Sequence, residues 1–210
     1  MNLKNIISRS FNYVILTSKK YNIDESHSLK HSMEVFHHAN KIYTSELPKN
    51  LFLFQQRDII YVSSIIHDMC DKKYMNEEKG LDEMNEFLKE MPLDKLTIVN
   101  KIVSTMSYSK VRSSGFPNLL EYQLAYNIVR EADLLSAYDV DRCIIYQMMH
   151  EKCSYHDSLE KAIKLFECRV LKYIQDDLFT TNYSKQHASI LHIKALQDIQ
   201  YLKQIYNIKE

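Results

Sequence analysis

A histidine and an aspartate, His67 and Asp68, stand side by side directly after an apolar run that ends in Ile65 and Ile66. Burying such groups costs free energy unless something binds them. Successive side chains on a helix point about 100° apart, so these two can converge on one object only near a helix end. The negative end of the helix dipole favours a cation at that position. The pair therefore indicates a metal ion; the alternative is a capping aspartate beside a histidine satisfied within the protein.

Two other segments offer metal ligands on faces that are predicted to point inward. His31 lies on an apolar stripe of the segment after Asp24, and Asp133 lies on a face of small residues between about Leu119 and Tyr138. Two imidazoles and two carboxylates form a mixed nitrogen and oxygen donor set, which suits Mn²⁺, Fe²⁺, Zn²⁺ or Co²⁺. An ion with open coordination positions lowers the pKa of bound water and polarises a phosphoryl oxygen. The donor set therefore favours hydrolytic chemistry.

Long helices must position these groups, because the 210 residues include only two glycines and three prolines. We expect an all-α, single-domain bundle of about eight to ten helices over residues 1–210. Its metal-binding core would span about 22–140, and a C-terminal helical pair about 156–207. Apolar periodicity and capping residues place helices at about 3–21, 24–47, 55–69, 76–91, 93–107, 119–138, 139–150, 157–178 and 184–206.

One stretch, from Tyr108 to Pro117, interrupts the helical pattern and resembles a long loop. It carries Lys110 and Arg112 and is rich in hydroxyl groups. Two interpretations stay open: a solvated connection, or a loop that covers an anionic ligand.

Composition limits the environment and partners of the chain. Lys+Arg and Asp+Glu both number 27, so no overall charge would attract a nucleic acid polymer or an anionic membrane. No apolar run approaches the roughly 20 residues needed to span a bilayer. The cysteines have no paired spacing and no secretory signal precedes them, which predicts reduced thiols and a cytoplasmic protein. Because no acidic residue precedes Asp24, a transit peptide is the alternative for the N-terminus.

At the proposed ligands the sequence resembles the HD-domain superfamily of metal-dependent phosphohydrolases, and more closely its small bacterial nucleotide (pyro)phosphohydrolase branch. Residues 27–35 align with a His-Asp-x-x-His-x-x-Arg-Val motif, and residues 66–73 with Leu-His-Asp-x-x-Asp-x-Lys. Residues 102–108, 129–137 and 179–188 are similar to later motifs of the family in the same order. The resemblance thus covers most of the chain.

The resemblance implies roles for individual residues. It implies that a divalent metal is held by His31, His67, Asp68 and Asp133. Mn²⁺ is the first candidate, with Fe²⁺, Co²⁺, Zn²⁺, Ni²⁺ and Mg²⁺ as alternatives. Catalysis would depend on Asp68, Asp71 and Lys73. The cations available for substrate binding are Lys72, Lys73, Lys110 and Arg112. The expected substrate is a small phosphorylated molecule, with a nucleotide as the first candidate.

Several positions depart from the family pattern. Glu34 and Leu134 replace arginines, while Ser28 and Ser136 replace aspartates. Two bidentate phosphate contacts are therefore lost, and phosphate recognition must come from other residues or be weaker. The alternative function is a catalytically degenerate HD-type protein that binds metal or nucleotide, or regulates a partner.

The other histidines lack partners at ligand spacing. His27, one turn before His31, is expected to support the metal ligands from behind. Surface or packing roles are expected for His37, His38, His150, His156, His187 and His192.

Overall fold

Long stretches without glycine or proline form helices in the computed structural model, which describes residues 2–206 and 208. These residues contain ten α-helices, two short 3-10 helices and no strand, so the predicted all-α fold is confirmed. In chain order the elements are α1 (Leu3–Tyr21), α2 (Leu29–Glu46), α3 (Leu53–Ile66), α4 (Glu77–Phe87), α5 (Leu93–Thr105), α6 (Tyr108–Ser114), η1 (Leu120–Tyr122), α7 (Gln123–Ser136), α8 (Val140–Met149), α9 (Tyr155–Cys168), η2 (Val170–Lys172) and α10 (Asn182–Ile205).

Side chains at the helix ends define several of these boundaries. Asn76 and Thr181 accept hydrogen bonds from backbone N–H groups in the first turns of α4 and α10. Asn22 ends α1 in the left-handed conformation, with φ of 53°, which asparagine tolerates well. Helix α3 ends at Ile66, so His67 and Asp68 lie at its C-terminal end, as the sequence predicts.

The core lies where α2, α3 and α7 pack against one another. Every residue from Ile59 to Ile66 of α3 is buried, which explains why this part of the helix carries no charged side chain. Helices α1 and α5 cover other faces of α3. Burial of each large aliphatic side chain contributes about 1.5–3 kcal/mol, so this three-helix contact holds its ligand-bearing faces in place.

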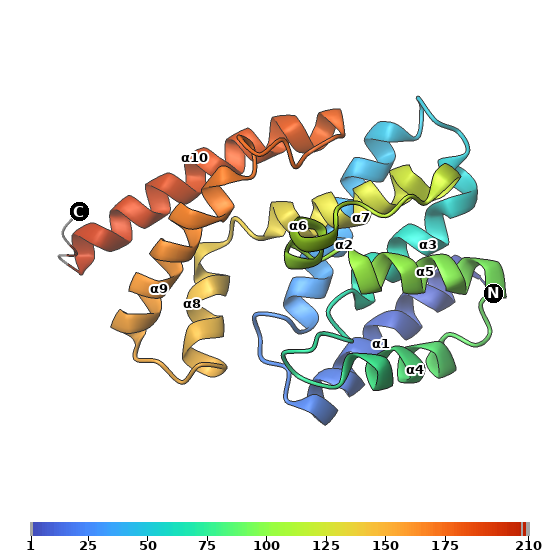
Figure 1. Cartoon of the computed structure of the whole chain (residues 1–210), viewed down its shortest axis with the longest axis horizontal. Helices are drawn as coiled ribbons and strands as arrows, with labels where there is room; N and C mark the ends of the chain where they lie inside the picture. Colours follow the sequence, from blue (N-terminus) through green and yellow to red (C-terminus); the bar gives the residue numbers. More distant parts are fainter. Residues whose placement is uncertain (1, 207, 209–210) are drawn as a thin grey trace.

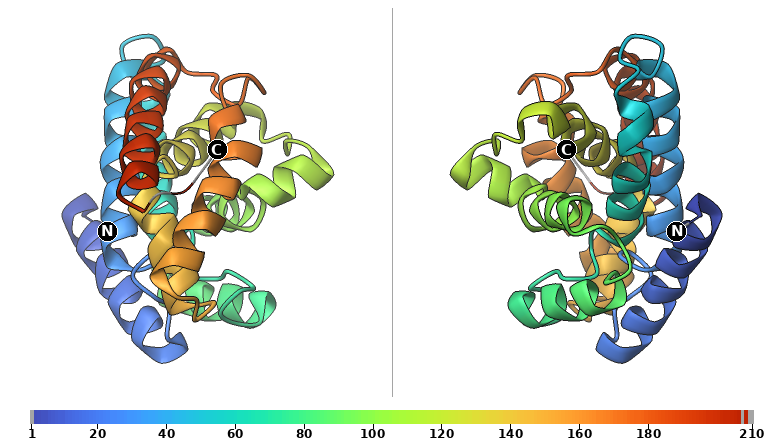
Figure 2. Two further views of the ribbon diagram at one scale, coloured as in Figure 1. Left: turned by 90° about the vertical axis from the view of Figure 1, so that its left-hand side faces the viewer. Right: turned by 90° about the vertical axis from the view of Figure 1, so that its right-hand side faces the viewer.

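Helices α8, α9 and α10 gather on one side of α7, opposite α1, α4 and α5 (Figure 1). Helix α8 packs against α9, and α10 contacts α2, α7 and α8. Seen from that side, α10 runs across the face of α2 that it contacts (Figure 2). None of the helices in the described part of the chain is long and apolar enough to cross a membrane.

Several segments differ from the sequence predictions. The helix predicted over 157–178 ends at Cys168, and the one predicted over 76–91 ends at Phe87. The expected loop from Tyr108 begins with helix α6, which ends at Gly115, where φ is 74°. A helix of seven residues is too short for apolar periodicity to reveal it. The second helix begins at Leu29 rather than after Asp24, because the Asp24 carboxylate accepts hydrogen bonds from the backbone and hydroxyl of Ser26 and forms a local turn.

Candidate metal centre

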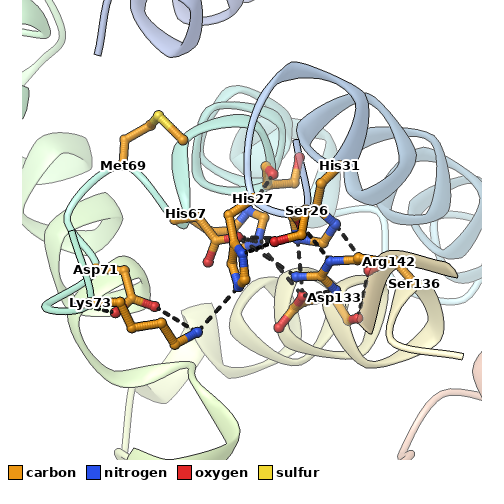
Figure 3. A network of polar contacts seen from close by, with 12 residues as sticks. Ser26, His27, His31, His67, Met69, Asp71, Lys73, Asp133, Ser136 and Arg142 are labelled. Atoms are coloured by element: carbon orange, nitrogen blue, oxygen red, sulfur yellow. Dashed lines mark hydrogen bonds and ion pairs between the residues drawn. The ribbon is translucent and has the colours of Figure 1, made fainter. Parts of the chain in front are cut away.

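Three packed helices bring together the four residues predicted to bind metal. The Nε2 atoms of His31 and His67 lie 3.0 Å apart. Asp68 Oδ2 lies 3.2 Å from each of these nitrogens. Asp133 Oδ1 lies 3.4 Å from the Nε2 atom of His31 and 3.6 Å from that of His67. Figure 3 shows the two imidazoles facing Asp133. Ligands about 2.0–2.2 Å from one ion, on neighbouring vertices of a tetrahedron or octahedron, would be separated by about 2.8–3.6 Å, so these spacings fit a single ion.

Hydrogen bonds behind the ligands orient both imidazoles. His67 Nδ1 lies 3.0 Å from the carbonyl oxygen of Ser64, and a carbonyl can only accept, so this nitrogen carries the proton. His31 Nδ1 lies 3.5 Å from the hydroxyl of Ser136, which itself donates to the carbonyl of Asp133. Partners of this kind are typical of metal-bound histidines, because they direct Nε2 toward the ion.

The site needs a cation at its centre. If both imidazoles were neutral with Nδ1 protonated, two Nε2 lone pairs would face each other across 3.0 Å, so these nitrogens share a cation, either a proton or a metal ion. The Oδ2 atom of Asp68 is buried, and it lies 3.2 Å from the Nε2 atoms of both histidines. His31, His67 and Asp133 each offer a ligand atom, and these atoms all lie within 4.8 Å of one another. The donor set therefore fits a divalent ion.

The pKa values of the site residues also indicate that a cation belongs between the ligand atoms. Burial by itself lowers the pKa of His67, but the Asp68 carboxylate and hydrogen bonds with Asp133 and Asp68 outweigh burial and raise this pKa to about 10. Burial opposes the charged forms of Asp68 and Asp133, yet both pKa values lie well below their usual range. For Asp68 the largest opposing cause is the charge of His67, and for Asp133 it is a hydrogen bond with His31. Without an ion, the cluster therefore holds a proton in its place.

A cavity of about 430 Å³ opens next to these residues, and His67, Asp68 and Asp133 form part of its lining. Apolar and aromatic side chains make one wall, among them Val103, Met106, Tyr108, Leu165, Val170 and Tyr173. A small organic molecule fits a cavity of this size and character. The cluster and the cavity together form the candidate site.

The structure shows which of the predicted catalytic and substrate-binding residues line the cavity. Lys72, Lys73 and Lys110 line the cavity, as does Asp71. The Lys73 ammonium lies 3.3 Å from Asp71 Oδ2, and the Lys110 ammonium forms an ion pair with Glu77. Lys110 is therefore largely neutralised.

Arg112 lies outside the cavity lining, and its Nη1 atom donates to the hydroxyl of Tyr108 at a distance of 3.1 Å. A role of Arg112 in substrate binding therefore stays a prediction that the cavity lining does not support. Tyr108, one turn earlier on α6, does line the cavity, so Arg112 lies next to the lining without being part of it.

His27 is a hydrogen-bond partner of Lys73. Its Nε2 atom lies 3.2 Å from the Lys73 ammonium, and its Nδ1 atom lies 2.6 Å from the hydroxyl of Ser26 (Figure 3). The hydroxyl of Tyr74 lies 3.1 Å from the same Nδ1 atom. Burial lowers the pKa of His27 well below its usual value, so the ring is neutral and can accept from Lys73. None of these hydrogen bonds is to one of the four proposed ligands, so support of the ligands by His27 stays a prediction.

Sequence reasoning missed two arginines of the cavity, Arg142 and Arg169. Arg142 approaches both carboxylates of the candidate centre, at 3.9 Å from Asp68 Oδ2 and 4.0 Å from Asp133 Oδ1. Arg169 lies over the ring of Tyr108, with its guanidinium carbon 4.2 Å from the ring centroid. The available signal was the segment 138–141, which stands where the resembled family has glycine-rich sequence and directly precedes Arg142.

Comparisons with known proteins identify a similar fold. The chain is similar to the crystal structure of a structural-genomics target from Lactobacillus plantarum, with a TM-score of 0.73 and 18% sequence identity over 98% of each chain. Neither a protein-family model nor a curated protein matches the chain. A likeness at this identity concerns the fold alone, so the chemistry has to be argued from the site.

Proposed function

We propose that this protein is a metal-dependent phosphohydrolase of the HD type that acts on a small phosphorylated substrate, with a nucleotide as the first candidate. One observation carries the proposal: His31, His67, Asp68 and Asp133 converge beside a cavity of about 430 Å³ whose wall also carries cationic side chains. A divalent ion held there, with Mn²⁺ as the first candidate, would activate a water molecule and polarise a phosphoryl oxygen.

The chain's own residues would orient the substrate around that ion. Ser64 and Ser136 fix the imidazoles of the ligand histidines. Lys73, beside Asp71 and His27, brings an ammonium group to the lining of the same cavity, where it would stabilise the negative charge that develops during phosphoryl transfer. The aromatic wall, which includes Tyr108 and Tyr173, suits a planar organic group such as a base. A small phosphorylated molecule fits this site better than a nucleic acid polymer, because the cavity is of ligand size.

The test combines metal binding with phosphate release. Metal-free protein is titrated with Mn²⁺ by calorimetry and then assayed against nucleoside mono-, di- and triphosphates. We expect binding of Mn²⁺ and Mn²⁺-dependent release of phosphate or pyrophosphate from at least one nucleotide. Excess Mn²⁺, at about 100 times the dissociation constant, should stabilise the fold by about 2.7 kcal/mol, seen as a higher melting temperature.

His31→Ala should lose Mn²⁺ binding, the melting shift and hydrolysis together. The matched control is His37→Ala, which removes an exposed histidine from the same helix and should leave all three unchanged. If the His31 variant binds Mn²⁺ and hydrolyses nucleotides like the wild type, this centre is not the site of the reaction.

A second candidate is an HD-type protein that binds metal and nucleotide without turnover and regulates a partner. One observation favours it: Leu134 lines the cavity at a position where the resembled family carries arginine. In that case the titrations would show Mn²⁺-dependent nucleotide binding, while no nucleotide of the panel would release phosphate.

A further inference from the structure

Arg142, on α8, lies at the mouth of the candidate metal centre on a different element from every ligand. Its side chain is 16% exposed, and its Nη2 and Nη1 atoms form long ion pairs with Asp68 Oδ2 at 3.9 Å and Asp133 Oδ1 at 4.0 Å. Figure 3 shows this guanidinium beside Asp133. Distances near 4 Å are too long for hydrogen bonds. The Nη groups therefore make no hydrogen bond to these carboxylates.

A short hydrogen bond holds the guanidinium in place. Arg142 Nε donates to the backbone carbonyl of Ser26 at 2.6 Å, which ties α8 to the turn before α2. The backbone N–H of Arg142 is in turn capped by Asp139, the residue that begins α8. With Nε engaged and the backbone fixed, the outer edge of the guanidinium keeps its two Nη groups available for a ligand. Such an edge matches two oxygens of a phosphate group.

A charge count shows why Arg142 is available to an anion. The carboxylates of Asp68 and Asp133 contribute two negative charges, and a divalent ion on the proposed centre would contribute two positive charges. The positive charge of Arg142 would then lack a balancing carboxylate in the centre. A positively charged, partly buried site binds anions more strongly than an exposed one, because the surrounding dielectric is low.

Three of the four other cations that line the cavity have partners within the described chain. Lys110 forms an ion pair with Glu77, and Lys73 lies 3.3 Å from Asp71 Oδ2. Arg169 lies over the ring of Tyr108, and its Nε donates to the hydroxyl of Tyr173 at 2.9 Å. Lys72 is exposed at the edge of the cavity.

We infer that Arg142 forms the phosphate-binding subsite of this protein, receiving two phosphoryl oxygens of the substrate through its Nη groups. It would take over a role that the family resemblance assigns to arginines at the positions of Glu34 and Leu134. The inference rests on the proposed function in one respect, because it assumes that the centre holds a divalent ion. The side chain that would bind phosphate is Arg142 itself. The ligand class is a phosphate monoester or phosphoanhydride, and inorganic phosphate is the simplest probe.

The experiment measures binding of inorganic phosphate to Mn²⁺-loaded protein by calorimetry, for the wild type, Arg142→Gln and Arg142→Lys. Glutamine can still donate to the Ser26 carbonyl, but it lacks the positive charge and the pair of Nη groups of the guanidinium. We expect Arg142→Gln to weaken phosphate binding by about 10- to 100-fold, the size of a lost charge-assisted contact. Arg142→Lys, which keeps the charge only, should weaken it by about 3- to 10-fold. The stoichiometry of Mn²⁺ should stay the same in both variants.

The matched control is Arg112→Gln, which removes an arginine that lies outside the cavity and should bind phosphate as the wild type does. Circular dichroism checks that each variant is folded. If Arg142→Gln does not fold, Arg142→Lys alone is compared with the wild type. Wild-type affinity for phosphate in both Arg142 variants would overturn the inference, even if Mn²⁺-dependent hydrolysis is found. Conversely, phosphate binding that depends on Arg142 in a protein that hydrolyses no nucleotide would support the subsite and contradict the proposed enzyme.

Discussion

At the scale of single residues, a proton and a metal ion would compete for the same nitrogen and oxygen atoms of the candidate centre. The Nε2 atoms of His31 and His67 lie 3.0 Å apart, with a carboxylate oxygen of Asp68 3.2 Å from each. The pKa of His67 is raised to about 10, so a proton occupies this group when no metal is bound. A metal ion must displace that proton, since only an unprotonated nitrogen can act as a ligand.

Asp68→Asn tests the contribution of charge at this centre. Asparagine keeps the volume and one oxygen but removes a negative charge, so Mn²⁺ affinity should fall by at least about 100-fold and phosphate release under limiting Mn²⁺ should fall with it. Calorimetry and a phosphate assay measure the two effects. The control is Asp82→Asn on the exposed face of α4, which should change neither. Hydrolysis by Asp68→Asn at the wild-type rate would rule out a catalytic ion at this position.

Lys73 is expected to act on turnover rather than on metal binding. Its ammonium lies 3.2 Å from His27 Nε2, and its ion pair is with Asp71 rather than with one of the four ligands. Lys73→Ala should therefore leave Mn²⁺ affinity within about twofold of the wild type and lower kcat by about 100-fold, the usual loss when a transition-state donor is removed. Steady-state kinetics with the best nucleotide gives kcat. Lys79→Ala, an exposed lysine on α4, is the control, and a lowered Mn²⁺ affinity in Lys73→Ala would show that the lysine supports the centre instead.

At the scale of elements, one buried carboxylate joins α7 to the segment before α10. Glu131 is fully buried, and its two oxygens accept from the backbone N–H and the hydroxyl groups of Thr180 and Thr181. The neighbouring Arg130 donates to the carbonyl of Leu178. These bonds anchor the C-terminal helix to the helix that carries Asp133, so they determine how the ligand-bearing core is covered.

Glu131→Ala should cost about 3–5 kcal/mol of unfolding free energy, because it leaves several buried donors without acceptors. Glu131→Gln should cost less, about 2 kcal/mol, since one oxygen remains. Urea unfolding followed by circular dichroism measures both. Glu121→Gln, an exposed residue of η1, should be within about 0.5 kcal/mol of the wild type. A cost below about 1 kcal/mol for Glu131→Ala would show that the threonines find other partners.

At the scale of the whole molecule, α10 docks against α2 through a pair of histidines. The ring centroids of His38 and His187 lie 5.6 Å apart, and the Nδ1 atom of His38 is buried without a hydrogen-bond partner in the described chain. Burial, followed by the charge of His187, lowers the pKa of His38 from 6.5 to about 4. The pKa of His187 is also lowered, chiefly by burial.

This docking should weaken in acid. Between about pH 6.5 and pH 4 the unfolded chain binds a proton at His38 that the folded chain does not, so stability falls as the pH falls through this range and is unaffected above it. Protonation of His38 should lower the free energy of unfolding by at most about 2 kcal/mol at pH 5. Urea unfolding at pH 7.5 and pH 5 should show a smaller loss for His38→Gln than for the wild type. His37→Gln, on the exposed side of α2, should keep the wild-type loss; an equal loss in all three proteins would contradict this assignment.

The sequence by itself determined the local properties of this protein. Helical periodicity and the scarcity of glycine and proline predicted the all-α fold, and the His-Asp pair at the end of an apolar run was correctly placed at the C-terminal end of α3. These features depend on residues within a few turns of each other, which is why a single sequence reveals them. The type of donor group is likewise a property of the residue, so the sequence also predicted the mixed donor set of His31, His67, Asp68 and Asp133.

Only the tertiary structure decided which distant groups meet. Arg142 on α8 and Arg169 just after α9 reach the cavity through the packing of α8 against α9, whereas Arg112 is outside its lining although Tyr108 and Lys110 of the same helix are in it. Likewise, Glu131 meets Thr180 and Thr181 only where the chain returns to α7. Contacts between helices depend on crossing angles and on the fit of many side chains at once, and apolar periodicity specifies a buried face without specifying its partner. For this reason the donors of the candidate centre could be predicted from the sequence, whereas the arginine that we place at its phosphate subsite could not.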